Sequence, residues 1–242
     1  TMMVPTMFVR LLRESEDKRE QYSFPDLALV ISAAAACPVP VKDAMIEWLG
    51  PIIFDFYGGT EGGVTACTSA QWLEKPGTSG PPIPEVELKV FSDEGVELPA
   101  GEIGVVYMTP TVGATIPEYF KDSDKTASVK RGNFYPLGDM GYLDNDGWLF
   151  LVDRRSDLII SGGVNIYPSE IEQVLIQHPA VRDVAVVGKP DHEWGQLAWA
   201  FVALEDGAAD SPKLREDVLG FAEQRLAKFK LPKELKVIDE LP

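Results

Sequence analysis

The spacing of apolar positions changes along the first 70 residues. Residues 4–12 and 41–50 place apolar side chains at helical intervals, whereas residues 27–31 and 51–59 begin with short apolar runs that are typical of buried strands. The run at 27–31 leads into small residues and prolines, which indicates a strand followed by a turn. Helices that alternate with buried strands predict α/β layers around a parallel sheet.

Residues 80–153 have a different pattern. The segments "VELKVF", "IGVVYM" and "WLFLVD" are rich in β-branched and aromatic residues, and the sequences "SDEG", "PAGE" and "NDG" that set them off are typical of turns. We expect a small, mostly antiparallel sheet or a distorted barrel here.

After Asp153 the pattern becomes that of a compact α+β unit. A helix is predicted from Pro168 onward, strands at 181–188 and 196–204, and a last helix with Ser211 as its N-cap. A domain boundary is therefore expected near residues 153–156. It divides the chain into residues 1–153 and 154–242.

Composition and charge narrow the possible functions. The chain has 242 residues, of which 45% are hydrophobic and 25% charged, as in ordinary soluble globular proteins. Its formal net charge of -16 argues against nonspecific binding to nucleic acid or to an anionic membrane, because both would be repelled. An anionic ligand must therefore be held by local donors.

The cysteines and the longest apolar run bear on location. Cys37 and Cys67 form neither a disulfide framework nor a CxxC pair, and two histidines cannot assemble a histidine-rich metal site. These features favour a reducing cytoplasm. Residues 27–41 are interrupted by Ser32 and two prolines and fall short of the roughly 18 apolar residues of a membrane helix, so no transmembrane segment is expected. The first residues lack the features of a signal peptide.

Three polar motifs are candidates for chemistry. "YGGTEGG", residues 57–63, follows an apolar strand and would place an aromatic ring, a hydroxyl and a carboxylate at the carboxyl edge of a sheet; a tight turn with an exposed acid is the alternative. Asp139 lies between glycines before a "DNDG" turn, which it could simply cap. The adjacent glycines Gly162 and Gly163 also fit an ordinary hairpin turn.

Taken together, the order and spacing of these motifs resemble the adenylate-forming superfamily of acyl-CoA synthetases, luciferases and peptide-synthetase adenylation domains. The segments that carry the resemblance are "YGGTEGG", "GEIG" at 101–104, "LGDMGYLDNDGWL" at 137–149, "DRRSDLIISGGVNIYPSEIE" at 153–172 and "HPAVRDVAVVGKPDHEWGQ" at 178–196. Within the superfamily, "SGGVNIYPSEIE" looks most like acyl-CoA synthetases, and "SAAAACPVPVKDAMIEWLGPII" looks like a fatty-acyl type.

The resemblance implies a nucleotide site. In the family the aromatic residue matched by Tyr57 stacks on adenine, the acid matched by Asp139 accepts hydrogen bonds from the ribose hydroxyls, and the arginine matched by Arg154 faces ribose and phosphate. The threonine matched by Thr60 contacts the α-phosphate, and the glutamate matched by Glu61 holds Mg²⁺, which needs only one or two carboxylates. The nucleotide-binding residues so implied are Ala34, Ala35, Ala36, Tyr57, Gly58, Thr60, Asp139 and Arg154.

The resemblance also implies a moving domain. It predicts the end of a large N-terminal domain, built from an α/β layer and a small barrel-like β subdomain, followed by a small mobile α+β domain that is truncated at its end. Ser156 occupies the hinge position, where the family usually has Asp or Lys, and this departure leaves the energetics of the rotation open. The turn of Ser161, Gly162 and Gly163 would line the pantetheine tunnel for CoA, where a Cβ would narrow the passage.

The implied reaction joins a carboxylic acid, expected to be a fatty acid, to ATP and then to CoA. The family's phosphate loop and its adenylation lysine have no match in the 242 residues, so we expect a piece of a longer synthetase that is inactive by itself. Two other functions stay open at this point. The chain could belong to an adenylating enzyme that loads a carrier protein, or it could be a non-catalytic nucleotide-binding module.

Overall fold

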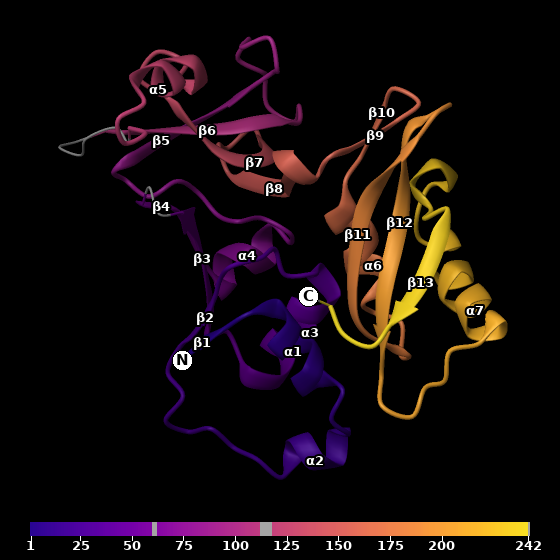
Figure 1. Ribbon diagram of the computed structural model, residues 1–242. Coiled ribbons are helices and arrows are strands. Elements are labelled where there is room, and N and C mark those ends of the chain that lie inside the picture. The colour runs from indigo at the N-terminus through magenta and orange to yellow at the C-terminus, as the bar shows by residue number, and fades with distance from the viewer. Residues whose placement is uncertain (60–61, 112–117, 242) are drawn as a thin grey trace. The chain divides into compact units, whose positions relative to one another are not determined.

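The computed structural model describes residues 1–59, 62–111 and 118–241, which form two compact units (Figure 1). Unit 1 is Thr1–Leu151 and unit 2 is Val152–Pro242. The predicted domain boundary between Asp153 and Arg154 stays a prediction.

The first layer of unit 1 is a four-stranded sheet. Its order is β1 (Met2–Met3), β2 (Val30–Ser32), β3 (Ile53–Gly59) and β4 (Gly62–Thr68). The first three strands are parallel, as predicted, whereas β4 returns antiparallel to β3. The strand expected at 27–31 is displaced, because β2 begins only at Val30.

The helices of this layer are α1 (Pro5–Leu12), α2 (Glu16–Glu20), α3 (Val39–Leu49) and α4 (Ser69–Glu74). The helix predicted at 41–50 is α3, and its C-cap residue Gly50 has a φ of 82°. One buried cluster joins α1, α3 and α4 to the strands. Its members are Phe8, Val30, Val41, Met45, Ile46, Ile53, Cys67 and Trp72.

The second layer of unit 1 is an antiparallel sheet, as the β-type segments predict. Its strands are β5 (Val86–Phe91), β6 (Gly104–Pro110), β7 (Tyr135–Leu143) and β8 (Leu149–Arg154), in that order, and α5 (Ser123–Val129) lies between β6 and β7 in the chain. A second cluster joins the two sheets, because Val64 of β4 and Leu149 of β8 are both completely buried in it. Strand β7 was not predicted, and it carries Asp139.

Unit 2 has the predicted α+β organisation (Figure 1). A short 3-10 helix, η1 (Arg155–Asp157), precedes the hairpin of β9 (Ile159–Ser161) and β10 (Val164–Ile166). The unit continues with α6 (Pro168–Leu175), β11 (Val181–Asp191), β12 (Gly195–Leu204), α7 (Pro212–Glu223), η2 (Lys228–Lys230) and β13 (Glu234–Ile238). The sheet order is β10-β9-β12-β11, and β13, which was not predicted, pairs parallel with β12. The predicted N-cap is confirmed, since Ser211 Oγ accepts a hydrogen bond from Leu214 N at 3.2 Å.

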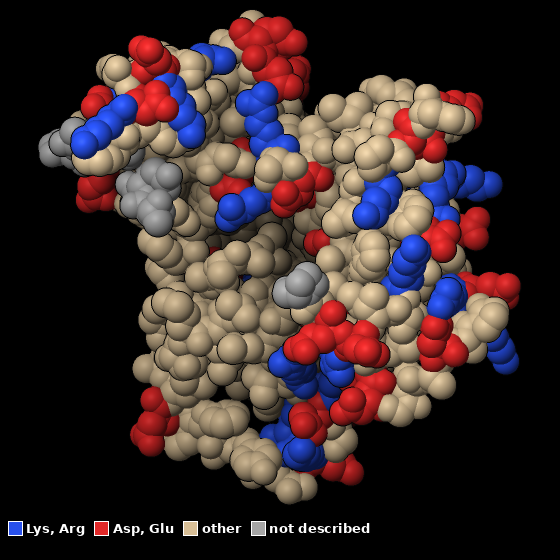
Figure 2. All heavy atoms as spheres, in the orientation of Figure 1, with Lys and Arg blue, Asp and Glu red and all other residues tan. Residues whose placement is uncertain are grey.

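The surface carries both signs of charge. On the face shown in Figure 2, acidic and basic side chains are interspersed, although the whole sequence has 38 acidic and 22 basic residues. In the part of the chain that the structure describes, no helix is both long enough and apolar enough to cross a bilayer.

Candidate nucleotide-binding site

Tyr57 and Asp139 meet in unit 1 although they lie 82 residues apart in the sequence. The Tyr57 hydroxyl donates a hydrogen bond to Asp139 Oδ2 at 2.6 Å. Tyr57 stands near the carboxyl end of β3, and its ring packs partly against the cluster that joins the two sheets. Asp139 projects from the middle of β7 and is half-buried. The structure therefore brings the predicted adenine-stacking residue and the predicted ribose-binding residue together.

The turn that follows Asp139 is capped by another acid. The turn is held by Asp144, whose Oδ1 accepts hydrogen bonds from Asp146 N and Trp148 N, both at 2.9 Å. The glycines around Asp139 allow the backbone conformation and the close strand packing of β7. Gly138 has a φ of 83°, and a Cβ on Gly141 would lie 2.5 Å from the Phe150 carbonyl oxygen. Asp144 thus fills the capping role in this turn, and the role of Asp139 at a ribose stays a prediction.

The segment Ala34 to Ala36 lies exposed just beyond β2, at the same sheet edge as Tyr57. The two strands are parallel neighbours, so their carboxyl ends meet there. Ala34 has a φ of 75°, a left-handed conformation that costs an L-residue about 1–2 kcal/mol. Among the described non-glycine residues only Lys121 shares this feature. Strain of this kind is often retained at ligand-binding sites.

The rest of the "YGGTEGG" motif is only partly described. Gly58 pairs with Gly63, and a Cβ on Gly58 would lie 2.4 Å from the Gly62 carbonyl oxygen, so the close approach of β3 and β4 requires glycine. Thr60 and Glu61 lie outside the described residues, and their roles at the α-phosphate and Mg²⁺ stay predictions. Among the residues that are described, no group of three or more His, Cys, Asp or Glu side chains could hold a metal ion.

Arg154 and Ser156 belong to the start of unit 2. The Arg154 side chain is exposed, and its backbone N–H donates to Asp153 Oδ1 at 2.7 Å. The other oxygen of Asp153 accepts from Ser169 N at 2.9 Å, which ties this segment to the first turn of α6. Ser156 lies in η1, and its hydroxyl donates to Asp157 at 2.8 Å. The nucleotide contact of Arg154 and the hinge role of Ser156 stay predictions.

Gly162 and Gly163 form the two-residue turn between β9 and β10. Ser161 pairs with Val164 across the hairpin, and the glycines have φ values of 57° and 81°. Tight hairpins of this type need positive φ at both central residues, so the hairpin explanation of the glycine pair is confirmed. The CoA-binding role of Ser161, Gly162 and Gly163 stays a prediction.

Trp194 is a neighbour of this turn that the sequence analysis did not single out. Gly162 N donates to the Trp194 carbonyl at 2.8 Å, and a Cβ on Gly162 would lie 2.7 Å from the indole ring. The indole is 50% exposed. An aromatic residue in the polar turn sequence "DHEWGQ" was the available signal, because an exposed tryptophan beside a predicted ligand-binding turn is itself a candidate for ligand contact.

The two glycines differ in the space around them, which gives a stability prediction. A Cβ on Gly163 would meet nothing within 4 Å, so only its φ opposes a side chain. We expect Gly163→Val to destabilise unit 2 by about 1–2 kcal/mol, and Gly163→Asn, which tolerates this conformation, to cost clearly less. Urea unfolding of the three chains measures the difference. Equal losses for both variants would show that something other than φ selects glycine here.

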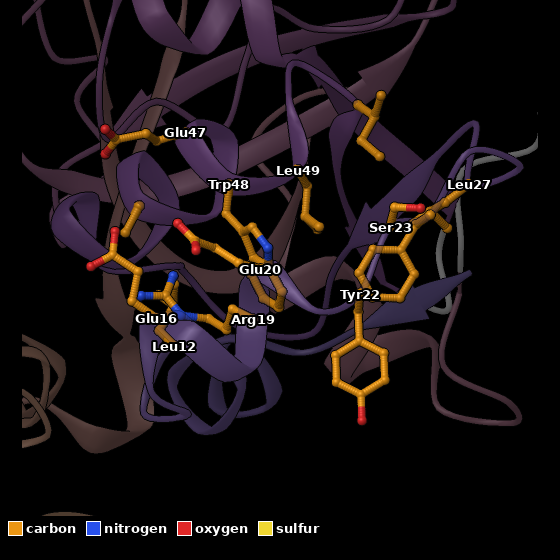
Figure 3. A pocket seen from close by; sticks show the side chains of 13 residues that line it. Leu12, Glu16, Arg19, Glu20, Tyr22, Ser23, Leu27, Glu47, Trp48 and Leu49 are labelled. Atoms are coloured by element: carbon orange, nitrogen blue, oxygen red, sulfur yellow. The ribbon is translucent and has the colours of Figure 1, made fainter.

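A cavity of about 680 Å³ in unit 1 lies apart from the predicted site (Figure 3). It is bounded by α2, the segment that follows it and the end of α3. Trp48 lines it, with the Arg19 guanidinium 5.4 Å from its ring centroid and Phe24 edge-on at 6.2 Å. Ile52, which precedes β3, also lines it, so the cavity is at the opposite end of β3 from Tyr57. None of the predicted site residues contributes to its wall.

Comparison with known proteins identifies the family. The family model described as AMP-binding enzyme matches residues 1–114, and the one described as AMP-binding enzyme C-terminal domain matches residues 170–242. A 2-succinylbenzoate–CoA ligase from Bacillus cereus is 40% identical over 218 residues, which cover 89% of this chain and 43% of the relative. The chain spans about half the length of the curated relatives it matches.

Solved structures also match over the whole length of this chain, and two of them serve as examples. One is o-succinylbenzoate CoA synthetase from Bacillus subtilis in complex with its acyl-adenylate intermediate, with a TM-score of 0.84, 32% identity and 47% of that chain covered. The other is an amide bond synthetase from Marinactinospora thermotolerans, with a TM-score of 0.84, 30% identity and 49% of that chain covered. The names of these three proteins mention no fatty acid, so the expected fatty-acid substrate has no support from them. The chain belongs to the AMP-binding enzymes of the adenylate-forming superfamily.

Proposed function

We propose that this chain supplies the nucleotide and CoA sites of an AMP-forming acid–thiol ligase. In this reaction the carboxylate of an acid attacks the α-phosphorus of ATP, which gives acyl-AMP and releases pyrophosphate. The thiol of CoA then attacks the acyl carbon, and AMP leaves. The observation that carries the proposal is the contact between Tyr57 and Asp139 at the carboxyl edge of β3.

The geometry of this contact suits a nucleoside. An ionised carboxylate offers about four acceptor positions, so Asp139 can take the Tyr57 hydroxyl and both ribose hydroxyls. The same hydrogen bond fixes the orientation of the Tyr57 ring, whose flat face is then available to adenine. The exposed backbone of Ala34 to Ala36 stands at the same edge and can close the other side of the base.

For the acid we propose an aromatic carboxylate in place of a fatty acid. The support is that two of these relatives, from Bacillus cereus and Bacillus subtilis, are named for succinylbenzoate as their substrate. The same names support CoA as the acyl acceptor. The amide bond synthetase shows that a relative of equal structural similarity makes a different product, so the acceptor needs its own test. Mg²⁺ and a cytoplasmic location remain predictions from the sequence.

Pyrophosphate exchange tests the acid and the acceptor separately. The enzyme is expressed from the complete reading frame that encodes this chain and is given ATP, Mg²⁺ and either 2-succinylbenzoate, benzoate, octanoate or palmitate. We expect kcat/KM for exchange to be about tenfold or more higher with an aromatic acid, as differences in pocket fit usually produce. With CoA added, the thioester should form.

The possible failures have different meanings. Preference for palmitate would contradict the proposed acid class. If acyl-AMP accumulates in the presence of CoA and is consumed only by a carrier protein, the carrier-loading alternative is correct. AMP binding without exchange for any acid would instead indicate a non-catalytic nucleotide-binding module.

A further inference from the structure

A buried ion pair lies beneath the candidate nucleotide site. The Lys42 Nζ of α3 donates to Asp55 Oδ2 of β3, and the two side chains are 1% and 17% exposed. The ammonium also lies 4.6 Å from the ring centroid of Trp72, which is itself buried. A charge removed from water in this way is costly unless it is paired, and such pairs often add less stability than apolar packing would. Stability alone therefore does not explain why a lysine occupies this position.

The ion pair connects the two ends of the segment that contains Ala34 to Ala36. At the first end, Ser32 is the last residue of β2 and is in register with Asp55. At the other end, the Pro38 carbonyl accepts hydrogen bonds from the backbone N–H groups of Val41 and Lys42, both at 3.0 Å. Residues 33–38 thus leave the sheet beside Asp55 and lead into the first turn of α3, which contains Lys42. We call residues 33–38 the β2–α3 loop.

The ion pair is also close in the sequence to Tyr57, the aromatic residue of the candidate site. Asp55 precedes Tyr57 by two residues in β3, and side chains two residues apart project from the same face of a strand. The irregularity in the pairing of β3 with β4 comes only after Tyr57. A shift of Asp55 would therefore be passed to Tyr57 through one rigid strand.

We propose that Lys42 is a positioning residue for the nucleotide. Through Asp55 its ammonium holds the β2–α3 loop and Tyr57 at the separation that an adenine ring requires between them. A base held on both faces needs a gap of about 7 Å, twice the optimal carbon–carbon separation, and a gap about 1 Å wider already forfeits up to about half of the attraction in these contacts. Lys42 itself does not touch the nucleotide. The inference rests on the proposed function, because it assumes that a nucleotide binds between these two elements.

The groups around Lys42 make its effect dependent on pH. Asp55 of β3, Cys67 of β4 and Trp72 of α4 surround the ammonium, together with Cys37 just before α3. Burial lowers the pKa of Lys42 to about 8, whereas burial raises the pKa of Cys37 to about 12 and also raises the pKa of Cys67. Between pH 7 and 9 the thiols stay neutral while Lys42 loses its charge. The positioning effect should be present below pH 8 and lost above it.

Calorimetric titration of AMP into the 242-residue chain tests the proposal. The variants are Lys42→Met, Asp55→Asn and the double variant, and Lys75→Met is the matched control. Lys75 resembles Lys42 because it is paired with carboxylates and lies 4.9 Å from a tryptophan ring centroid. It differs in position, because it follows α4 and its carboxylate and tryptophan partners belong to neither the β2–α3 loop nor β3. At pH 7 we expect Lys42→Met and Asp55→Asn to weaken AMP binding about tenfold, within the range that misplaced binding groups cause, and Lys75→Met to change nothing.

Two further measurements separate positioning from stability. The double variant removes both charges, so it should unfold at a higher temperature than either single variant while its AMP affinity stays low. From pH 7 to pH 9 the wild-type affinity should fall by about the same tenfold factor, because deprotonation removes the same interaction, and Lys42→Met should be flat. These measurements decide the question even if one single variant folds poorly.

The outcomes are distinct. If AMP affinity recovers together with stability in the double variant, or if wild type and Lys42→Met share one pH profile, Lys42 is only structural and the inference is wrong. If the wild-type chain does not bind AMP at pH 7, the proposed nucleotide site is wrong, and this inference fails with it.

Discussion

Asp139→Ala is expected to weaken AMP binding by about 2–4 kcal/mol, which corresponds to roughly 30- to 1000-fold in Kd. Each ribose hydroxyl that donates to the carboxylate forms a charge-assisted bond, and such bonds contribute about 1.5–3 kcal/mol. The variant also leaves the Tyr57 hydroxyl without its acceptor, so the ring loses its fixed orientation. Calorimetry with the 242-residue chain at pH 7 measures the effect.

Two control variants show whether the loss of affinity is specific to Asp139. Tyr57→Phe keeps the aromatic face and removes only the hydroxyl, so we expect a loss of about 1 kcal/mol, the usual value of one hydrogen bond. Asp144→Ala removes the acid that caps the neighbouring turn and should leave AMP affinity unchanged. If Asp139→Ala bound AMP as tightly as wild type, Asp139 would have no part in the ribose site.

Trp72→Ala is expected to destabilise unit 1 by about 3–5 kcal/mol, the usual cost of removing a buried tryptophan side chain from a core. Trp72 is 2% exposed and belongs to the cluster that packs α3 against β3. Its loss would leave a cavity and would also remove the ring that faces the Lys42 ammonium. Urea unfolding followed by circular dichroism reports the change.

Trp148→Ala is the matched comparison. Trp148 also lies beside a lysine, at 4.9 Å from Lys75 Nζ, but it is partly exposed at the hairpin between β7 and β8. We expect a loss below about 2 kcal/mol, since less apolar surface is buried there. Similar losses for the two variants would show that the first cluster is not the stabilising core of unit 1.

The periodicity of the sequence predicts those helices and strands whose apolar residues are not interrupted by turn-forming or small residues. The helix α3 and the strands β5, β6, β11 and β12 follow directly from it. Strand β4 was missed because "GGVTACT" is built mostly of small residues, and its pairing with β3 is what makes it a strand. In β7, Pro136 and the glycines around Asp139 are turn signals that tertiary pairing overrides.

The candidate site was likewise predicted only in part from the sequence. The motifs identify Tyr57 and Asp139 one at a time, whereas their contact depends on how two sheets pack within unit 1. Lys42 gives no signal in the sequence, because a lysine in an amphipathic helix is normally solvated. The fatty-acyl expectation rested on residues 32–53, and the structure shows that side chains such as Met45 and Ile46 build the core of α3. A resemblance in core residues carries little information about the acid.

Replacing AMP with 2′,3′-dideoxy-AMP in the same titration tests the central claim most directly. The dideoxy ligand keeps adenine and phosphate and lacks only the two hydroxyls that Asp139 would hold. We predict that wild type binds it roughly 30-fold or more weakly than AMP, in line with the charge-assisted bonds lost, and that Asp139→Ala binds the two ligands equally. Equal binding of the two ligands by the wild-type chain, or no binding of AMP at all, would contradict the assignment of this site to a nucleotide.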